Sequence, residues 1–337
     1  AISKAIISLL KFDPVIIGTI KKCSTGKLSE SLQDTLVDLS NISLLLKLMI
    51  ICPLPDLQFE SLLKNIRHAI LFNISKIKKI PEILTFQIAL SSQCFTNEYL
   101  YDQTDLEIQS LKDLEILVEK KLNNGEQPSS SELACLASYK ALHTYSWVDL
   151  LSIPIELEYL KKKQILEPRE ETQLSHKIPT LQEIKNNISR KVRGQYEQSP
   201  YPRWVNLGFP LIPKSISTIT KELKLKITNL CINEVNNPQI LVAGCGTGEH
   251  SIGVSSTFYN CDVLAIDLSL TSLAYAKRKT EELSISNIKY IQADILDLSL
   301  LDQKFDIIEC AGVLHHMDDP MAGWKVLTEC LNTGGLM

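Results

Sequence analysis

The first half of the chain, up to about residue 175, has apolar residues at the three- and four-residue spacing of helices, without a clear two-residue alternation. Polar residues that commonly begin helices divide this pattern. They are Asp56, before an apolar face that ends near Asn73, and two capping boxes, Thr104 with Glu107 and Ser129 with Glu132. The pattern predicts an all-α domain, to which we assign residues 1–178.

Helical periodicity is interrupted between Leu166 and Pro213 by repeated prolines, so we assign residues 179–214 to a Pro-rich connector. Thr180 and Glu183 have the spacing of a capping box and predict one short helix. From Gln195 to Trp204 two prolines favour an extended backbone. We expect the aromatic residues there to pack the connector onto the following domain, and direct substrate contact is the alternative.

Residues 215–337 change to short apolar runs that alternate with helical patterns. A helix is expected near Ser215, and further helices from about Glu249, Ser269 and Met321. The expected strands are Ile240–Ala243, Val263–Ile266, Ile288–Ile291 and Phe305–Ile308. Such alternation predicts the α/β class, with a doubly wound parallel sheet that has helices on both faces.

The ends of the sequence indicate a truncated protein. We expect the sheet to stop after its fourth strand, since Asn332–Met337 reads as a turn into a fifth strand. An unpaired sheet edge there would weaken cofactor binding and leave this chain inactive. The sequence begins Ala1-Ile2-Ser3, without an initiator Met or a signal-peptide pattern, so we expect it to be cut at both ends.

Composition excludes several classes of protein. The 337 residues carry 35 Lys and Arg against 39 Asp and Glu, a net charge of −4, so no nucleic-acid partner is expected. The apolar stretch Ile42–Pro55 contains Lys47 and Pro53, and is therefore too interrupted to cross a membrane. Nine cysteines without a CxxC pair favour reduced thiols, a cytoplasmic location and no metal site.

A glycine-rich turn follows the first expected strand. Gly244 permits a sharp turn and Gly246 lets the backbone approach a ligand, while Asp267 ends the second strand where such folds place an acid on ribose hydroxyls. The two features together predict a nucleoside site. In a dinucleotide-binding fingerprint the third glycine would stand at the position of Glu249. Here the third glycine is Gly248, one position earlier, and this spacing disfavours NAD. S-adenosylmethionine is the alternative cofactor.

From about residue 215 onward the sequence resembles the Rossmann-like, class I S-adenosylmethionine-dependent methyltransferases. The motifs that match are the glycine turn 244–248, Asp267, Asp294 with its neighbours 292–295, the loop 313–320 and the turn 331–335. The resemblance implies that Asp294 reaches the adenine amino group and that Ile295 lies on the ring. The candidate cofactor-binding residues are Gly244, Cys245, Gly246, Thr247, Gly248, His250, Asp267, Leu268, Asp294, Ile295 and Cys310.

The helical half, the Tyr201–Trp204 segment and Cys94–Tyr99 are similar to bacterial proteins that join a tetratricopeptide-like helical region to such a methyltransferase domain. The capping boxes and apolar faces of the helical half form a pattern independent of the nucleotide-binding motifs, so we expect a separate interaction domain that selects a protein partner or a substrate. No fixed 34-residue repeat is in register, although a degenerate helical array would also fit.

Two histidines follow the fourth expected strand, at the sheet edge where ligands bind in open α/β folds. His315 and His316 are therefore candidate general bases, with packing as the alternative. His250 is expected to frame the aminocarboxylate end of the cofactor, and Cys245 and Cys310 to be small packing residues near the site.

The sequence thus predicts a methyltransferase with an unidentified acceptor, either a small molecule or a protein. A non-catalytic scaffold that binds S-adenosylmethionine is the first alternative. An NAD-dependent oxidoreductase is the second.

Overall fold

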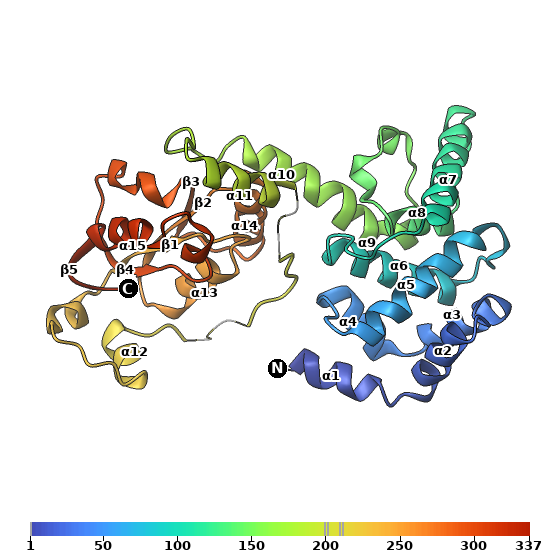
Figure 1. Ribbon diagram of the computed structural model, residues 1–337, viewed down its shortest axis with the longest axis horizontal. Helices are drawn as coiled ribbons and strands as arrows, with labels where there is room; N and C mark the ends of the chain where they lie inside the picture. Colours follow the sequence, from blue (N-terminus) through green and yellow to red (C-terminus); the bar gives the residue numbers. More distant parts are fainter. Residues whose placement is uncertain (1, 199, 201, 209, 211) are drawn as a thin grey trace. The chain divides into compact units, whose positions relative to one another are not determined.

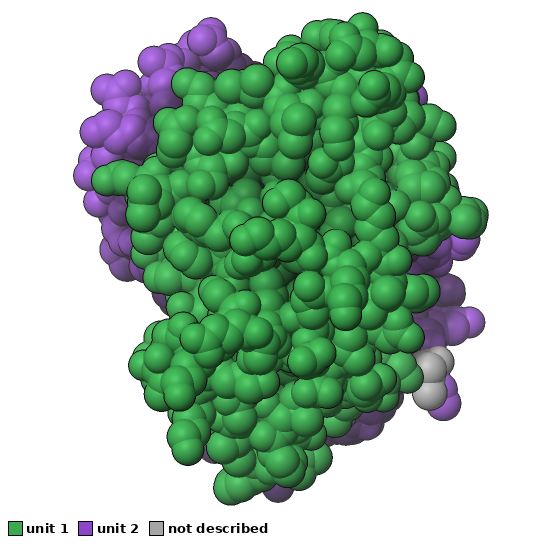
Figure 2. All heavy atoms as spheres, turned by 90° about the vertical axis from the view of Figure 1, so that its right-hand side faces the viewer, with its two compact units in different colours: residues 1–169 green, residues 170–337 purple. Residues whose placement is uncertain are grey.

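The computed structural model describes residues 2–198, 200, 202–208, 210 and 212–337. The chain forms two compact units, residues 1–169 and 170–337 (Figure 2). The division comes nine residues before the predicted boundary at 178. The physical reason is that residues after 169 pack into the second unit, where Leu174 and Ile178 join its core and Glu171 accepts a hydrogen bond from Arg278 Nε at 2.9 Å.

The first unit is helical, as the sequence predicts (Figure 1). Its α-helices are α1 (Ile2–Leu10), α2 (Pro14–Ser24), α3 (Leu32–Ser40), α4 (Ser43–Ile51), α5 (Leu57–Phe72), α6 (Pro81–Thr96), α7 (Asp105–Asn123), α8 (Ser130–Ala137) and α9 (Glu158–Lys161), with α10 (Glu167–Ser175) continuing into the second unit. Shorter helical turns are η1 (Ser29–Ser31), η2 (Ile74–Lys76), η3 (Leu142–Thr144), η4 (Val148–Leu150), η5 (Ile155–Leu157) and the π-helical turn η6 (Lys162–Leu166).

The predicted helix starts of this unit are confirmed. Asp56 Oδ1 accepts hydrogen bonds from the first amides of α5, including Gln58 N at 3.0 Å. Both capping boxes form, at Thr104 and at Ser129. Helix α6 packs against α3, α4 and α8, and its buried apolar residues lie in one hydrophobic core of aliphatic and aromatic side chains. No helix in the described part of the chain combines the length and the apolar character that a membrane span requires.

A buried ion pair lies within this helical core. The Arg67 guanidinium is 1% exposed, and its Nη2 atom lies 3.8 Å from Glu107 Oε1. Nη2 also donates to the carbonyl oxygen of Asp102 at 2.9 Å, and the guanidinium lies 4.2 Å from the centre of the Tyr139 ring. Since an isolated buried charge is strongly unfavourable, Arg67 depends on these partners.

Glu107 serves the capping box and the ion pair at the same time. Burial alone would raise the pKa of this carboxyl, but hydrogen bonds from Thr104 and Tyr139 and attraction to Arg67 bring the pKa below its ordinary value. The carboxylate is therefore the charged form that the fold favours, and its contribution to stability is lost when the pH falls through this lowered pKa.

The second unit contains a parallel sheet with the strand order β3-β2-β1-β4-β5. Its strands are β1 (Gln239–Ala243), β2 (Asp262–Asp267), β3 (Ile288–Gln292), β4 (Phe305–Glu309) and β5 (Leu331–Leu336). Its helices are α11 (Asn187–Gln198), α12 (Ile216–Glu222), α13 (Glu249–Thr257), α14 (Leu270–Glu282) and α15 (Pro320–Glu329), with helical turns η7 (Leu230–Glu234), η8 (Ile295–Leu300) and η9 (Leu314–His316).

The four predicted strands and the helices after them are confirmed, but the expected end of the sheet is wrong. Residues 331–336 form β5, which pairs with β4 from Phe305 to Ile307. The turn motif lies within β5 at an irregularity of the pairing, where Leu331 pairs with Phe305 and Leu336 with Ile307, and Gly334 between them adopts a φ of +83°. The β4 edge, expected to be unpaired, is therefore covered by β5.

Alternate residues of each strand enter the two faces of the sheet. On one face Ile240, Val242 and Val263 pack with side chains of α13 and α14. On the other face Leu241 and Leu264 pack with side chains of α15 and η8. A sheet covered on both faces, with its strand order reversing between β1 and β4, is the Rossmann-like doubly wound arrangement, and it places a ligand crevice at the carboxyl ends of those strands.

Two local predictions for the connector are wrong. Thr180 does not begin a helix; it lies in an isolated parallel bridge beside Gln292 of β3, and its Oγ1 donates to Gln292 Oε1 at 2.9 Å. The helix instead begins after Asn186, whose Oδ1 accepts from Ile188 N at 2.9 Å. Residues 195–198, expected to be extended, form the end of this helix. The local sequence motifs predicted the wrong conformation because contacts with distant residues determine the backbone conformation of this segment.

We expect Glu107→Ala to lower the free energy of unfolding of the helical unit by about 3–5 kcal/mol, because Arg67 would stay buried without a counter-charge. Glu132→Ala is the matched control: it also removes a capping-box carboxylate, but the partner of Glu132, Lys121, is partly exposed, and we expect a loss of about 1 kcal/mol. Hydrogen exchange measured by mass spectrometry on α5 to α8 checks both values. Equal losses would show that the ion pair adds nothing.

Candidate functional site

The glycine-rich turn leaves β1 at the carboxyl edge of the sheet. The amides of Gly244 and Cys245 both donate to Ile266 O of β2, at 2.8 and 2.9 Å, which holds the turn against the neighbouring strand. Gly244, Gly246 and Gly248 all have positive φ, at +74°, +53° and +87°. The sequence motif is therefore a backbone requirement as well as a ligand signature.

The three glycines differ in the space around them. A Cβ on Gly244 would lie 2.3 Å from a Val313 side-chain carbon, and one on Gly248 would lie 2.6 Å from Ala276 Cβ. A Cβ on Gly246 would have no heavy atom within 4 Å. Gly244 and Gly248 are thus constrained by packing, whereas Gly246 borders open space that a ligand can fill.

Asp267, the last residue of β2, joins this turn to the next loop. Its Oδ2 accepts from Gly246 N at 2.8 Å, and its Oδ1 accepts from Ser269 N at 3.0 Å. Burial raises the pKa of this carboxyl, and hydrogen bonds from the backbone of Ser269, Gly246 and Leu268 offset only part of that effect. Each carboxylate oxygen retains acceptor capacity, because an ionised carboxylate has about four lone-pair sites.

Asp294 lies beyond the end of β3, next to the Asp267 loop. It is 4% exposed, and its Oδ1 accepts from Leu296 N at 3.0 Å, which caps η8. The amide of Ala293 donates to Asp267 O at 3.1 Å, so the ends of β2 and β3 are joined directly. The two acids predicted from the sequence are thereby held on neighbouring strand ends.

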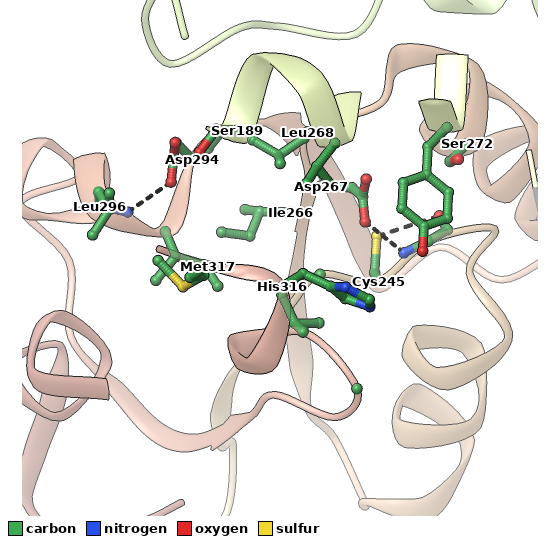
Figure 3. A pocket seen from close by; sticks show the side chains of 18 of the residues that line it. Ser189, Cys245, Ile266, Asp267, Leu268, Ser272, Asp294, Leu296, His316 and Met317 are labelled. Atoms are coloured by element: carbon green, nitrogen blue, oxygen red, sulfur yellow. Dashed lines mark hydrogen bonds between the residues drawn. The ribbon is translucent and has the colours of Figure 1, made fainter. Parts of the chain in front are cut away.

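These residues line one cavity of about 710 Å³ in the second unit, a size typical of small-molecule sites. Among the predicted candidates, those that line it are Gly244, Cys245, Gly246, Thr247, His250, Asp267, Leu268, Asp294, Ile295 and His316. The cavity lining does not include Gly248, Cys310 or His315. Figure 3 shows Ser189 and Leu268 on one side of the pocket and His316 and Met317 on the opposite side.

Sequence reasoning missed the part of the lining that comes from α11. Ile188, Ser189, Val192 and Tyr196 line the cavity from this helix. The spacing of these residues is a helical signal, but the nearby prolines favoured an extended connector. Tyr196 was expected to be a packing residue, and its position at the cavity also fits the alternative of substrate contact.

The predicted packing of the connector onto the sheet unit is confirmed for Trp204. Its indole Nε1 donates to Thr247 O at 3.0 Å, and Thr247 Oγ1 donates to Pro202 O at 2.7 Å. The Trp204 ring also packs edge-on against Tyr275, with 6.0 Å between ring centres. The connector is thus hydrogen-bonded to the glycine turn through Thr247. Tyr201 lies outside the described residues.

The three histidines near the sheet edge have different surroundings. His250 Nε2 pairs with Glu309 Oε2 at the end of β4, and this carboxylate raises the pKa of the imidazole despite its partial burial. The rings of His315 and His316 lie 4.0 Å apart, and both side chains are exposed. His250 and His316 face the cavity, whereas His315 lies outside its lining.

The cysteines near the site are poor nucleophiles. Burial raises the pKa of Cys245 well above its ordinary value and that of Cys310 to about 11. Both are therefore thiols near neutral pH. Within the described residues, no group of three or more His, Cys, Asp or Glu side chains is arranged to hold a metal ion.

The donor set fits a nucleoside cofactor such as S-adenosylmethionine. Gly246 leaves space for close approach, Asp267 offers acceptors to ribose hydroxyls, and Asp294 offers an acceptor to an amino group. Ile295 and Leu268 provide apolar surface for a ring.

Comparisons with known proteins agree with this geometry. Residues 240–335 match the family model described as a methyltransferase domain. An uncharacterized protein of Synechococcus sp. is 34% identical over 105 residues, which cover 31% of this chain and 25% of that protein. Release factor glutamine methyltransferase of Flavobacterium psychrophilum is 34% identical over 117 residues, which cover 35% of this chain and 40% of the enzyme.

One solved structure with a detectable likeness is PKMT2 from Rickettsia typhi in complex with AdoHcy. It has 27% sequence identity and a TM-score of 0.30, and the match covers 38% of this chain and 25% of the other. The chain therefore spans between a quarter and two fifths of the length of these three proteins.

The glycine geometry predicts losses of stability of different size at two positions. Gly248→Ala should lower the free energy of unfolding of the sheet unit by more than about 2 kcal/mol, because the new Cβ overlaps Ala276 and its backbone. Gly246→Ala should cost about 1 kcal/mol, the conformational penalty of positive φ alone. Urea denaturation followed by circular dichroism checks the order, and a larger loss for Gly246→Ala would contradict this assignment.

Proposed function

We propose that residues 170–337 form an S-adenosylmethionine-dependent methyltransferase unit. The observation that carries the proposal is that Gly246, Asp267 and Asp294 meet in one cavity at the carboxyl ends of β1, β2 and β3. The match of residues 240–335 to the methyltransferase domain supports it. Glu249 in place of a third dinucleotide glycine argues against NAD.

The role of Asp267 rests on contacts made in the fold, and the roles of Asp294 and Ile295 are those that the resemblance to the methyltransferases implies. The Asp267 carboxylate has one oxygen on the Gly246 amide and the other on the Ser269 amide, and its remaining lone pairs would accept from two ribose hydroxyls. Asp294 would accept from the adenine amino group, and Ile295 would pack on the ring. Leu268, Cys245 and Thr247 complete this part of the cavity wall.

His250, in its protonated form, would attract the carboxylate at the aminocarboxylate end of the cofactor. The hydrogen bond to Glu309 raises the pKa of the His250 imidazole, which favours its imidazolium form. The same pair ties α13, and hence the helix after the glycine turn, to the end of β4.

S-adenosylmethionine, when bound, supplies an electrophilic methyl group. The protein must then place an acceptor atom in line with it and exclude water, for which Val313 and Met317 provide apolar lining. An acceptor that loses a proton on methylation needs a base. Since His316 lines the cavity and His315 does not, we assign proton removal to the His316 imidazole.

We further propose that the helical unit selects the acceptor or a protein partner, in the cytoplasm. Tetratricopeptide-like character in this unit would suit that role. The acceptor itself is either a small molecule or a protein. A non-catalytic scaffold that binds the same cofactor would have this geometry as well, and turnover separates the two.

Asp267→Ala should weaken binding of S-adenosylhomocysteine by about 1.5–3 kcal/mol, because charge-assisted hydrogen bonds to ribose are lost. Asp262→Ala is the control, since Asp262 is an exposed acid at the other end of the same strand. Titration calorimetry on the full chain measures both. Tight binding of NAD without a response to S-adenosylhomocysteine would contradict the proposed cofactor.

Affinity for S-adenosylhomocysteine should also fall in acid. The pKa of Asp267 in the free protein is raised above 3.8, and protonation removes the charged acceptor, so affinity is full above that raised pKa and declines as the pH drops through it. Asp267→Asn should bind weakly, without this decline. Calorimetry across mildly acidic pH gives the comparison, and parallel curves for the two proteins would assign the titration to another group.

A further inference from the structure

Helix α11 forms a wall of the cofactor cavity, although it precedes the sheet in the chain. Its cavity-lining residues are Ile188, Ser189, Val192 and Tyr196, which share one helix face, whereas Lys191 and Gln195 are exposed. Figure 3 shows Ser189 on the same side of the pocket as Leu268, the residue after Asp267. The helix packs against α14. Whatever holds α11 in place therefore also shapes the cavity.

Glu197, near the end of α11, makes the polar connection to α14. Its Oε1 accepts from Leu270 N at 2.8 Å, and its Oε2 accepts from Thr271 N at 3.2 Å and from Thr271 Oγ1 at 2.5 Å. Next to it, Ser269 Oγ donates to Tyr196 O at 3.2 Å. A carboxylate at a helix N-terminus is also favoured by the helix dipole.

Helix α14 does not need Glu197 in order to begin. It has a local N-cap, since Ser269 Oγ accepts from Ser272 N at 3.0 Å. Glu197 binds two further amides from a position 73 residues earlier in the chain. The additional bonds therefore join α11 to α14 rather than start a helix.

The segment that Glu197 binds directly follows Asp267 at the end of β2. Ser269 N donates to Asp267 Oδ1, and Asp267 Oδ2 holds Gly246 N, so a continuous set of hydrogen bonds runs from α11 to the glycine turn. The negative charge of Glu197 contributes to the raised pKa of Asp267, as expected for two nearby carboxylates.

We propose that Glu197 is a positioning residue for the cofactor site, which holds the α11 wall against the Asp267 loop. The inference rests on the proposed function. Without this carboxylate α11 would separate from α14, and the wall that includes Tyr196 would no longer close on a bound nucleoside. The sheet and the glycine turn would keep their own contacts.

The test combines binding of S-adenosylhomocysteine, measured by calorimetry, with hydrogen exchange of α11 and α14 in the full chain. We expect Glu197→Ala to weaken binding about tenfold or more and to speed exchange in α11. Glu197→Gln keeps one oxygen for one amide and should recover part of the affinity. In the natural protein the ligand should slow exchange in α11.

Ser215→Ala is the matched control, because Ser215 Oγ caps α12 through Thr218 N, away from the cavity lining. We expect the affinity of Ser215→Ala for S-adenosylhomocysteine to stay within about twofold of the natural value, because this substitution removes only a helix cap. Wild-type affinity in Glu197→Ala, with faster exchange confined to α14, would overturn the positioning role and leave the proposed function standing. No binding by the natural protein would overturn the proposed function and this role with it.

Discussion

The hydrogen bond between the Asp267 carboxylate and the Gly246 amide is the contact on which the site depends. The parallel register pairs Val242 with Ala265 and Ala243 with Ile266, which brings the glycine turn to the same edge as the end of β2. The amides of Gly244 and Cys245 then bind Ile266 O, and Asp267 closes the arrangement from the side chain. The strand register, the geometry of the glycine turn and the placement of the ligand acceptors therefore depend on the same set of contacts.

This arrangement sets competing demands on one carboxylate. Burial disfavours its charge and raises its pKa, whereas the Gly246 and Ser269 amides favour the charge. A nearby second carboxylate, Glu197, adds repulsion but brings the α11 wall to the loop. The site therefore keeps an acid whose ionised form is only partly compensated in the free protein. Hydrogen-bond donors on a ligand would further stabilise the buried Asp267 carboxylate. The unfavourable burial of this charge in the free protein would then favour ligand binding.

The sequence was a good guide wherever the decisive contact is local. The caps at Asp56 and Thr104 act within three residues, and the buried strands are short apolar runs, so both could be predicted. The failures have partners far away in the chain. Thr180 bonds to a residue 112 positions later and Glu197 to one 73 positions later, and neither partner leaves a signal beside the motif. The glycine spacing and Asp267 form an exception, because the strand–helix–strand unit fixes their separation.

The charge of the cavity agrees with the chemistry proposed for it. Its described lining includes the acids Glu249, Asp267, Asp294, Asp318 and Asp319, and no Lys or Arg. An acidic cavity favours a cationic ligand, and a sulfonium methyl donor has one more positive charge than the thioether left after transfer. The cavity would therefore hold the donor more strongly than the spent product by electrostatics alone. Since the hydrogen-bonding groups of ribose and adenine are the same in both molecules, hydrogen bonds from Asp267 and Asp294 to those groups would not create that difference.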